Sequence, residues 1–219
     1  MTTLTKPTAR AASTALALEH ASDFAASADN AIKRMCDIFA SLLGIILLTP
    51  VWIIVALAVR LNDGGPAFFT QERVGLNGTT FTMFKFRTMR VDAEAMKASL
   101  VEANEADSSA GNSIMFKMTN DPRITRIGAF LRKTSIDELP QLFNVLRGDM
   151  SLVGPRPPLP SEVAQYEPRV MGKFAVRPGI TGLWQISGRS NLSWDETVHL
   201  DLSYAQHRSL TLDAWIMLQ

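Results

Sequence analysis

Two adjacent carboxylates, Asp137 and Glu138, lie in a segment rich in arginine, glycine and proline that covers residues 132–157. An aspartate carboxylate can act as a covalent nucleophile in phosphoryl transfer. A neighbouring acid can supply an oxygen ligand to Mg²⁺, which binds one or two carboxylates together with substrate phosphates. The pair therefore fits magnesium-assisted phosphate chemistry, with Asp137 directed at the phosphate and Glu138 at the metal.

The same acids also have a purely structural explanation. Ser135 and Glu138 have the spacing of a capping box, in which the serine caps a helix and the glutamate returns to the serine amide. The pattern predicts a helix over residues 136–147. The start of such a helix would present amides and a positive dipole that favour a phosphate. Spacing alone leaves capping and catalysis open as alternatives.

A predicted strand supplies two cations. Lys85 and Arg87 alternate with Phe84 and Phe86, so the two basic side chains share one face while the two rings anchor the other. Two cations on a rigid strand suit a diphosphate. An ordinary solvated strand face would have the same pattern.

Arg156 differs from an ordinary surface arginine because Pro155 and Pro157 restrict the backbone on both sides of it. Holding an arginine in this way is useful for a substrate contact and has little purpose for a solvated charge. The pattern therefore favours a phosphate-binding role for this turn.

An uncharged apolar run covers residues 38–59. About 20 apolar residues suffice to cross a bilayer, so the run predicts a membrane segment, with a buried core helix as the alternative. Thr49 and Pro50 fall in its middle, where a proline kinks a helix. Each arm is then too short to cross a core of about 30 Å, which permits a re-entrant hairpin. A kinked spanning helix satisfies the same residues, because prolines are tolerated in membrane spans.

The remaining chain has the pattern of a mostly helical α/β domain. A β-hairpin is expected over residues 68–74 and 79–87, and helices are expected over 125–131, 194–206 and 212–218. The last helix is apolar enough to lie on a membrane interface, or it docks on the domain's own core. The expected organisation is a flexible tail at 1–30, a re-entrant membrane helix at 31–61 and a catalytic domain at 62–219.

Composition narrows the function classes. The 219 residues carry a formal net charge of +1, which gives no electrostatic argument for a nucleic-acid partner. The single cysteine, Cys36, excludes an internal disulfide and a cysteine-based zinc site. The three histidines are scattered without metal-ligand spacing.

These motifs together resemble the bacterial sugar transferase family, the monotopic phosphoglycosyl transferases that start exopolysaccharide and glycan assembly. The resemblance extends from about Lys33 to Gln219, and the small exopolysaccharide-initiating members are the most similar type. The motifs that carry it are Lys33-Arg34 with Asp37, the apolar run broken at Pro50, and residues 71–75, 84–89, 125–132, 135–146, 148–158 and 177–189.

The resemblance implies transfer of hexose-1-phosphate from a UDP-hexose to polyprenyl (undecaprenyl) phosphate, with release of UMP and a covalent aspartyl intermediate. It implies Asp137 as the nucleophile and Glu138 as the Mg²⁺ partner. The resemblance also implies that Arg132, Pro155, Arg156 and Pro157 hold phosphate or shape the site. More weakly, it implies that Lys85, Arg87 and Arg189 bind substrate phosphate or the nucleotide.

The resemblance also implies a re-entrant anchor, in which Thr49 stands where many members have serine. The protein is then expected in the bacterial inner (cytoplasmic) membrane, in contact with membrane lipid, with its catalytic domain in the cytosol. The hexose stays open between glucose and galactose, and a homo-oligomer stays open. Two other function classes compete with the enzyme. One is a membrane-anchored sensor of nucleotide or phospholipid phosphate that has lost activity, and the other is a scaffold whose apolar run spans the membrane.

Overall fold

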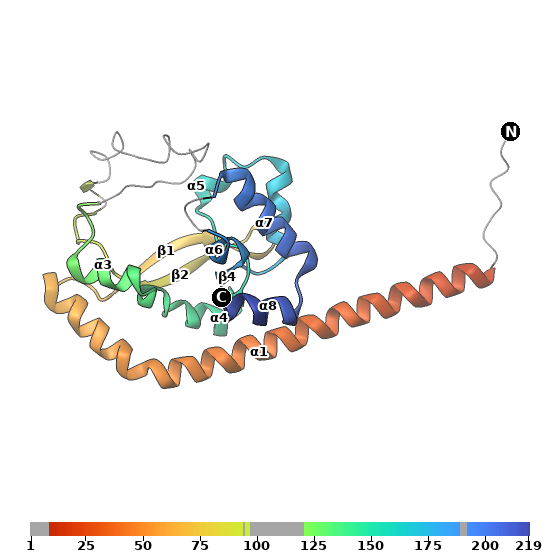
Figure 1. Ribbon diagram of the computed structural model, residues 1–219, viewed down its shortest axis with the longest axis horizontal. Helices are drawn as coiled ribbons and strands as arrows, with labels where there is room; N and C mark the ends of the chain where they lie inside the picture. Colours follow the sequence, from red (N-terminus) through yellow and green to blue (C-terminus); the bar gives the residue numbers. More distant parts are fainter. Residues whose placement is uncertain (1–8, 94, 97–120, 189–191) are drawn as a thin grey trace. The chain divides into compact units, whose positions relative to one another are not determined.

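The computed structural model describes residues 9–93, 95–96, 121–188 and 192–219, with side chains from residue 28 onward. The chain divides into two compact units, residues 1–36 and 37–219. Figure 1 shows the elements of the second unit around two small sheets. The elements are α1 (Ala9–Asp63), β1 (Phe68–Val74), η1 (Leu76–Gly78), β2 (Thr80–Phe86), α3 (Arg126–Lys133), η4 (Ile136–Glu138), α4 (Gln141–Arg147), β3 (Ser151–Val153), α5 (Pro160–Val163), η5 (Pro168–Ala175), β4 (Gly179–Thr181), α6 (Leu183–Ile186), α7 (Trp194–His207) and α8 (Leu210–Met217).

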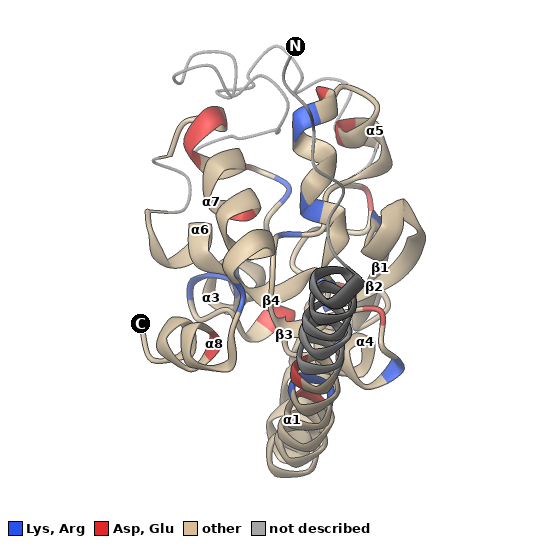
Figure 2. Ribbon diagram, turned by 90° about the vertical axis from the view of Figure 1, so that its right-hand side faces the viewer, with Lys and Arg blue, Asp and Glu red and all other residues tan. Residues whose placement is uncertain are grey.

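Helix α1 contains the apolar run. Its part from Ala28 to Asp63 is long and apolar enough to cross a membrane by length and composition. The part of α1 that is labelled in Figure 2 is mainly tan, because residues 38–59 carry no charge. Residues 9–30, which we expected to be a flexible tail, belong to the same helix, and their many alanines favour it.

Helix α1 bends within its orange part in Figure 1, where Pro50 interrupts the hydrogen-bonded ladder. Proline has no N–H to donate to the preceding turn. The Thr49 hydroxyl donates to the carbonyl oxygen of Ile45 at 2.7 Å, a side-chain contact that also bends helices. The bend separates two arms of α1, residues 37–49 and 51–63.

The second arm of α1 packs on the rest of the unit. Trp52, Val55 and Val59 are buried in one cluster with Phe86 of β2, Leu131 of α3 and Leu142 of α4. The Trp52 ring meets the Phe86 ring edge to face, with centroids 6.3 Å apart. The alternative of a core helix is therefore correct for one side of this arm, whereas Ile53, Ile54 and Leu57 on its other side are exposed.

Polar contacts fix α1 to the same unit near both ends of the apolar run. The backbone N–H of Leu152 in β3 donates to the buried Asp37 carboxylate at 3.1 Å. At the other end, Arg87 after β2 forms an ion pair with Asp63, the last residue of α1. The membrane segment and the α/β elements therefore form one folded unit.

The predicted β-hairpin is confirmed. Strands β1 and β2 pair antiparallel from Phe68 opposite Phe86 to Val74 opposite Thr80. The short strands β3 and β4 pair in parallel. Gly179, the first residue of β4, approaches Gly154 so closely that a Cβ on Gly179 would lie 2.0 Å from the Gly154 nitrogen. Only glycine fits there, and this contact fixes the start of the Pro155–Pro157 turn.

The burial of Trp52 predicts the effect of a mutation. Trp52→Ala removes a large ring from the cluster and should destabilise the fold by about 3–5 kcal/mol. The matched control Ile54→Ala, on the exposed side of the same arm, should change stability by about 0.5 kcal/mol or less. Thermal unfolding in detergent measures both, and equal losses would contradict the packing of this arm on the domain.

Candidate active site

The two acids are presented by a tight turn between α3 and α4. Ser135 has φ 57° and ψ 16°, which is the left-handed region, and its side chain makes no capping hydrogen bond. It follows the C-cap residue Thr134, a position where a left-handed residue commonly ends a helix. The predicted capping box and continuous helix over 136–147 are therefore wrong, because Ser135 terminates α3 instead of starting a helix. A 3₁₀ turn holds the acids, and α4 begins only after Pro140.

The Asp137 carboxylate is poorly solvated and lies among charges. The residue is 7% exposed. Burial raises the pKa of Asp137, Lys85 and Arg132 oppose this rise, and Glu138 adds to it. Among the described residues, no ion pair within 4 Å engages this carboxylate. It therefore combines a raised proton affinity with nearby cations that can attract a phosphate.

Glu138 lies in a different environment, although it is the next residue. Its Oε1 is 2.8 Å from Nζ of Lys85, and both side chains are partly exposed. Lys85 reaches the acid from β2, whose neighbouring residue Phe86 is buried in the core cluster. The alternation predicted for this strand thus brings one of its cations to the acid pair.

Arg132 reaches the same region from the last turn of α3. Its Nε donates to the Thr88 hydroxyl at 2.9 Å. Burial lowers the pKa of Arg132, and Asp137 opposes that effect. Helix α3 packs so closely on the chain after β2 that a Cβ at Gly128 would lie 1.9 Å from the Thr88 carbonyl oxygen. This close contact places the Arg132 guanidinium beside the acid pair.

Of the other two predicted cations, one pairs with a different acid and the other is not described by the structure. Arg87 is buried and forms an ion pair with Asp63 at the end of α1, a contact that joins the helix to the strand. Arg189 lies outside the described residues. Thr49 and Pro50 lie at the bend of α1, as the previous section describes.

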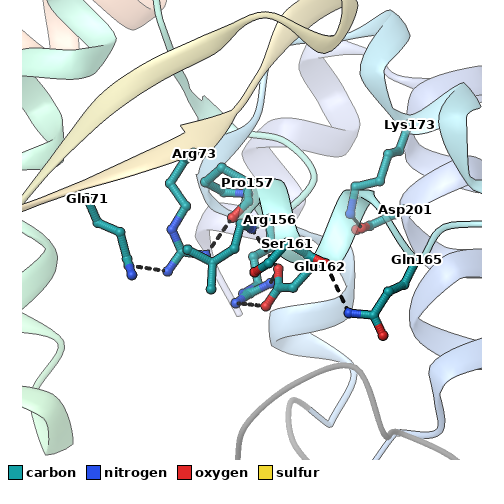
Figure 3. A network of polar contacts seen from close by, with 10 residues as sticks. Gln71, Arg73, Arg156, Pro157, Ser161, Glu162, Gln165, Lys173 and Asp201 are labelled. Atoms are coloured by element: carbon teal, nitrogen blue, oxygen red, sulfur yellow. Dashed lines mark hydrogen bonds and ion pairs between the residues drawn. The ribbon is translucent and has the colours of Figure 1, made fainter. Parts of the chain in front are cut away.

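The Pro155–Pro157 turn holds Arg156 against a buried acid (Figure 3). Nη1 and Nη2 of Arg156 lie 3.0 and 3.3 Å from the two carboxylate oxygens of Glu162. The backbone N–H of Leu159 donates to the same carboxylate at 2.8 Å. Burial alone would raise the pKa of Glu162, but Arg156 and this amide outweigh it and hold the pKa below its usual value.

Arg73 on β1 contacts the same turn, and our sequence analysis did not select it as a candidate. Its Nη1 donates to the Pro157 carbonyl oxygen at 3.1 Å and its Nη2 to Oε1 of Gln71 at 2.7 Å. Burial, together with the nearby charge of Arg156, lowers the pKa of Arg73 to about 10. The period-two spacing of Gln71 and Arg73 was the available signal, because it places both on one face of the strand.

The donor set near Asp137 is compatible with Mg²⁺ but does not form a closed cage. In the described ranges, no group of three or more His, Cys, Asp or Glu side chains lies close enough to hold a metal ion. Magnesium commonly uses one or two carboxylates and takes its other ligands from water and substrate phosphates. The adjacent Asp137 and Glu138 fit such an open site, and Glu138 keeps an oxygen beyond the one that Lys85 contacts.

Comparison with known proteins identifies the class. The bacterial sugar transferase family model matches residues 28–219, and the chain belongs to this family. It is 49% identical over 187 residues to the galactosyl transferase CpsE of Streptococcus agalactiae, covering 85% of this chain and 40% of the relative. It is 44% identical over 186 residues to the undecaprenyl-phosphate galactose phosphotransferase of Salmonella typhimurium, covering 85% and 39%.

A relative of similar size is the exopolysaccharide production protein ExoY of Rhizobium meliloti. The identity is 40% over 185 residues, which cover 84% of this chain and 81% of the relative. The chain spans about 40% of the length of CpsE and of the Salmonella protein.

The buried environment of Asp137 predicts that ionisation of its carboxyl group lowers the stability of the fold. An acid whose pKa is raised on folding binds its proton more tightly in the folded state, so its ionisation lowers stability as pH rises through that window. Asp137→Asn should therefore unfold at a higher temperature than the unsubstituted protein near pH 8. The difference should shrink as pH falls toward about 4, near the ordinary aspartate pKa.

The exposed Glu167 provides the matched control. Glu167→Gln should change stability little at either pH, by about 0.5 kcal/mol or less. A lower unfolding temperature for Asp137→Asn near pH 8 would contradict a destabilising charge at that position.

Proposed function

We propose that this protein transfers hexose-1-phosphate from a UDP-hexose to polyprenyl phosphate, releasing UMP, as the first membrane step of exopolysaccharide or glycan assembly. The observation that carries the proposal is the unequal environment of the acid pair. Asp137 is nearly buried and not engaged by an ion pair with any described residue, whereas Glu138 is engaged by Lys85. One acid is thus free to attack, and its neighbour is held in place.

Asp137 acts as the nucleophile in this proposal. A carboxylate oxygen of Asp137 attacks the phosphorus that bears the hexose, forming an O–P bond while the bond from that phosphorus to the oxygen of UMP breaks. An oxygen of polyprenyl phosphate then attacks the same phosphorus. The Asp137–phosphorus bond breaks, so that polyprenyl diphosphate hexose leaves and the carboxylate is regenerated. Each step exchanges one phosphoanhydride or acyl phosphate bond for another.

The cations beside the acids orient and neutralise the phosphates. Lys85 and Arg132 approach Asp137 from a strand and a helix that are both packed on the core. Positioned cations stabilise charge that develops on a transferring phosphoryl group. A bound Mg²⁺, with Glu138 as a ligand, would supply further neutralisation of the diphosphate.

Helix α1 supports a lipid substrate. Its second arm packs on the elements that carry the acids, while its other side exposes large apolar residues. We infer a re-entrant anchor in the bacterial inner membrane with both ends and the catalytic elements on the cytosolic side. This arrangement holds the acids at the depth of a lipid phosphate.

The first test is catalytic. Purified protein in lipid nanodiscs with polyprenyl phosphate and Mg²⁺ should release UMP from UDP-galactose or UDP-glucose. Asp137→Asn should reduce turnover by about 10⁴-fold or more, since it removes the nucleophile. Mass spectrometry of the protein incubated with donor alone should find a hexose phosphate on Asp137.

The control Glu167→Gln alters an exposed acid and should retain full turnover. Normal UMP release by Asp137→Asn would exclude covalent catalysis at this residue. Binding of UDP-hexose without turnover by the unsubstituted protein would instead support the nucleotide sensor.

The second test addresses topology. In a Cys36→Ser background, single cysteines replace His20 and His207, which lie on opposite sides of the apolar run in the sequence. A re-entrant anchor predicts that a membrane-impermeant maleimide labels both positions only after the inner membrane is permeabilised. Labelling of position 20 from the periplasmic side would establish a spanning helix and overturn the hairpin.

A further inference from the structure

A row of polar side chains leads away from the acid pair along one face of the hairpin. Phe69 lies opposite Lys85 and Gln71 lies opposite Met83, so Gln71 and Arg73 project from the same face as Lys85. Lys85 binds Glu138, and the charge of Glu138 also acts on Arg73. The row therefore connects the proposed nucleophile's neighbour to the Pro155–Pro157 turn.

Two guanidinium groups meet at the far end of this row (Figure 3). Arg73 donates to the carbonyl oxygen of Pro157, and Arg156 immediately precedes that proline. The two positive charges repel each other and are partly desolvated, as the lowered pKa of Arg73 reflects. Glu162 forms a direct ion pair with Arg156, whereas Arg73 has only the more distant charges of Glu162 and Glu138 to offset this repulsion. Such a pair is stabilised by a further anion, and guanidinium groups match the oxygens of a phosphate.

The Arg156 guanidinium is held at a defined position. The Glu162 carboxylate, 4% exposed, accepts both from Arg156 and from the Leu159 amide. The side chain of Arg156 nevertheless stays 28% exposed, so part of it faces outward for a ligand. The buried Glu162 thus holds the Arg156 guanidinium in place on one side and leaves its other side accessible.

We propose that Arg73 and Arg156 form a second phosphate site, separate from the Asp137 carboxylate, and that Glu162 is the positioning residue of Arg156. The inference rests on the proposed function, which requires a phosphate that is not attacked to be held near the acid pair. This phosphate belongs either to the nucleoside side of the donor or to the lipid acceptor. The chemistry that Arg73 and Arg156 recognise is the same in both cases.

Equilibrium binding tests the site without requiring turnover. Full-length protein in nanodiscs is titrated with UMP and, separately, with a short-chain polyprenyl phosphate. Arg73→Met should weaken one of these by about tenfold, the loss expected for a charge-assisted contact, without lowering the unfolding temperature. Arg169→Met, which removes an exposed arginine, is the control and should change neither affinity.

The outcomes are distinct. Weaker UMP binding assigns the site to the donor, and weaker polyprenyl phosphate binding assigns it to the acceptor. Unchanged affinity for both overturns the inference. A third outcome separates the two proposals. If the unsubstituted protein releases no UMP but its binding of UMP or polyprenyl phosphate still depends on Arg73, the proposed reaction is wrong and the phosphate site is supported.

Glu162→Gln separates positioning from a structural role. The amide can still accept from Leu159 but loses the charge that fixes Arg156. It should raise KM for the reactant assigned above by about tenfold while kcat changes far less, and Glu162→Asp should restore part of the loss. A fall in unfolding temperature with unchanged KM would show that Glu162 has only a structural role.

Discussion

The apolar contact between the second arm of α1 and the elements behind it is the constraint on which the rest of the structure depends. The elements around the acid pair contribute apolar residues to this contact: Phe86 beside Lys85, Leu131 beside Arg132, and Leu142 in the helix that follows the acid pair. Burial of these residues fixes their backbone positions. The positions of the charged side chains therefore depend on an apolar cluster to which α1 contributes.

Environment distinguishes the two adjacent acids. Burial dominates at Asp137 and raises its pKa, whereas Glu138 is partly exposed and paired with Lys85. Neighbouring carboxylates in different surroundings can take different chemical roles, as in other enzymes that use two acids. The local backbone is consistent with this difference, because the two acids are consecutive residues of a short 3₁₀ turn, on which neighbouring side chains lie about a third of a turn apart.

Local patterns predicted what depends on neighbours in sequence. The hairpin follows from strand alternation, and the bend of α1 follows from the missing N–H of Pro50. The adjacent acids are read directly from the sequence. The helix over 136–147 was wrong because the same serine could end one helix or begin another. The contacts of Arg73 with Pro157 and of Arg87 with Asp63 join residues distant in sequence. No spacing rule predicts such contacts. The sequence analysis therefore did not select Arg73, and it predicted a phosphate contact for Arg87 without its ion pair to Asp63.

The hydrogen bond from the Leu152 amide to Asp37 gives the apolar helix a structural role in the domain. The Asp37 carboxylate on α1 accepts from a backbone amide of the β3–β4 sheet that would otherwise lack this partner. A polypeptide that starts after α1 would carry an unsatisfied amide and an uncovered apolar surface at Phe86, Leu131 and Leu142. The elements around the acid pair therefore need α1 to complete their packing, which makes the apolar helix a part of the domain and not a detachable tether.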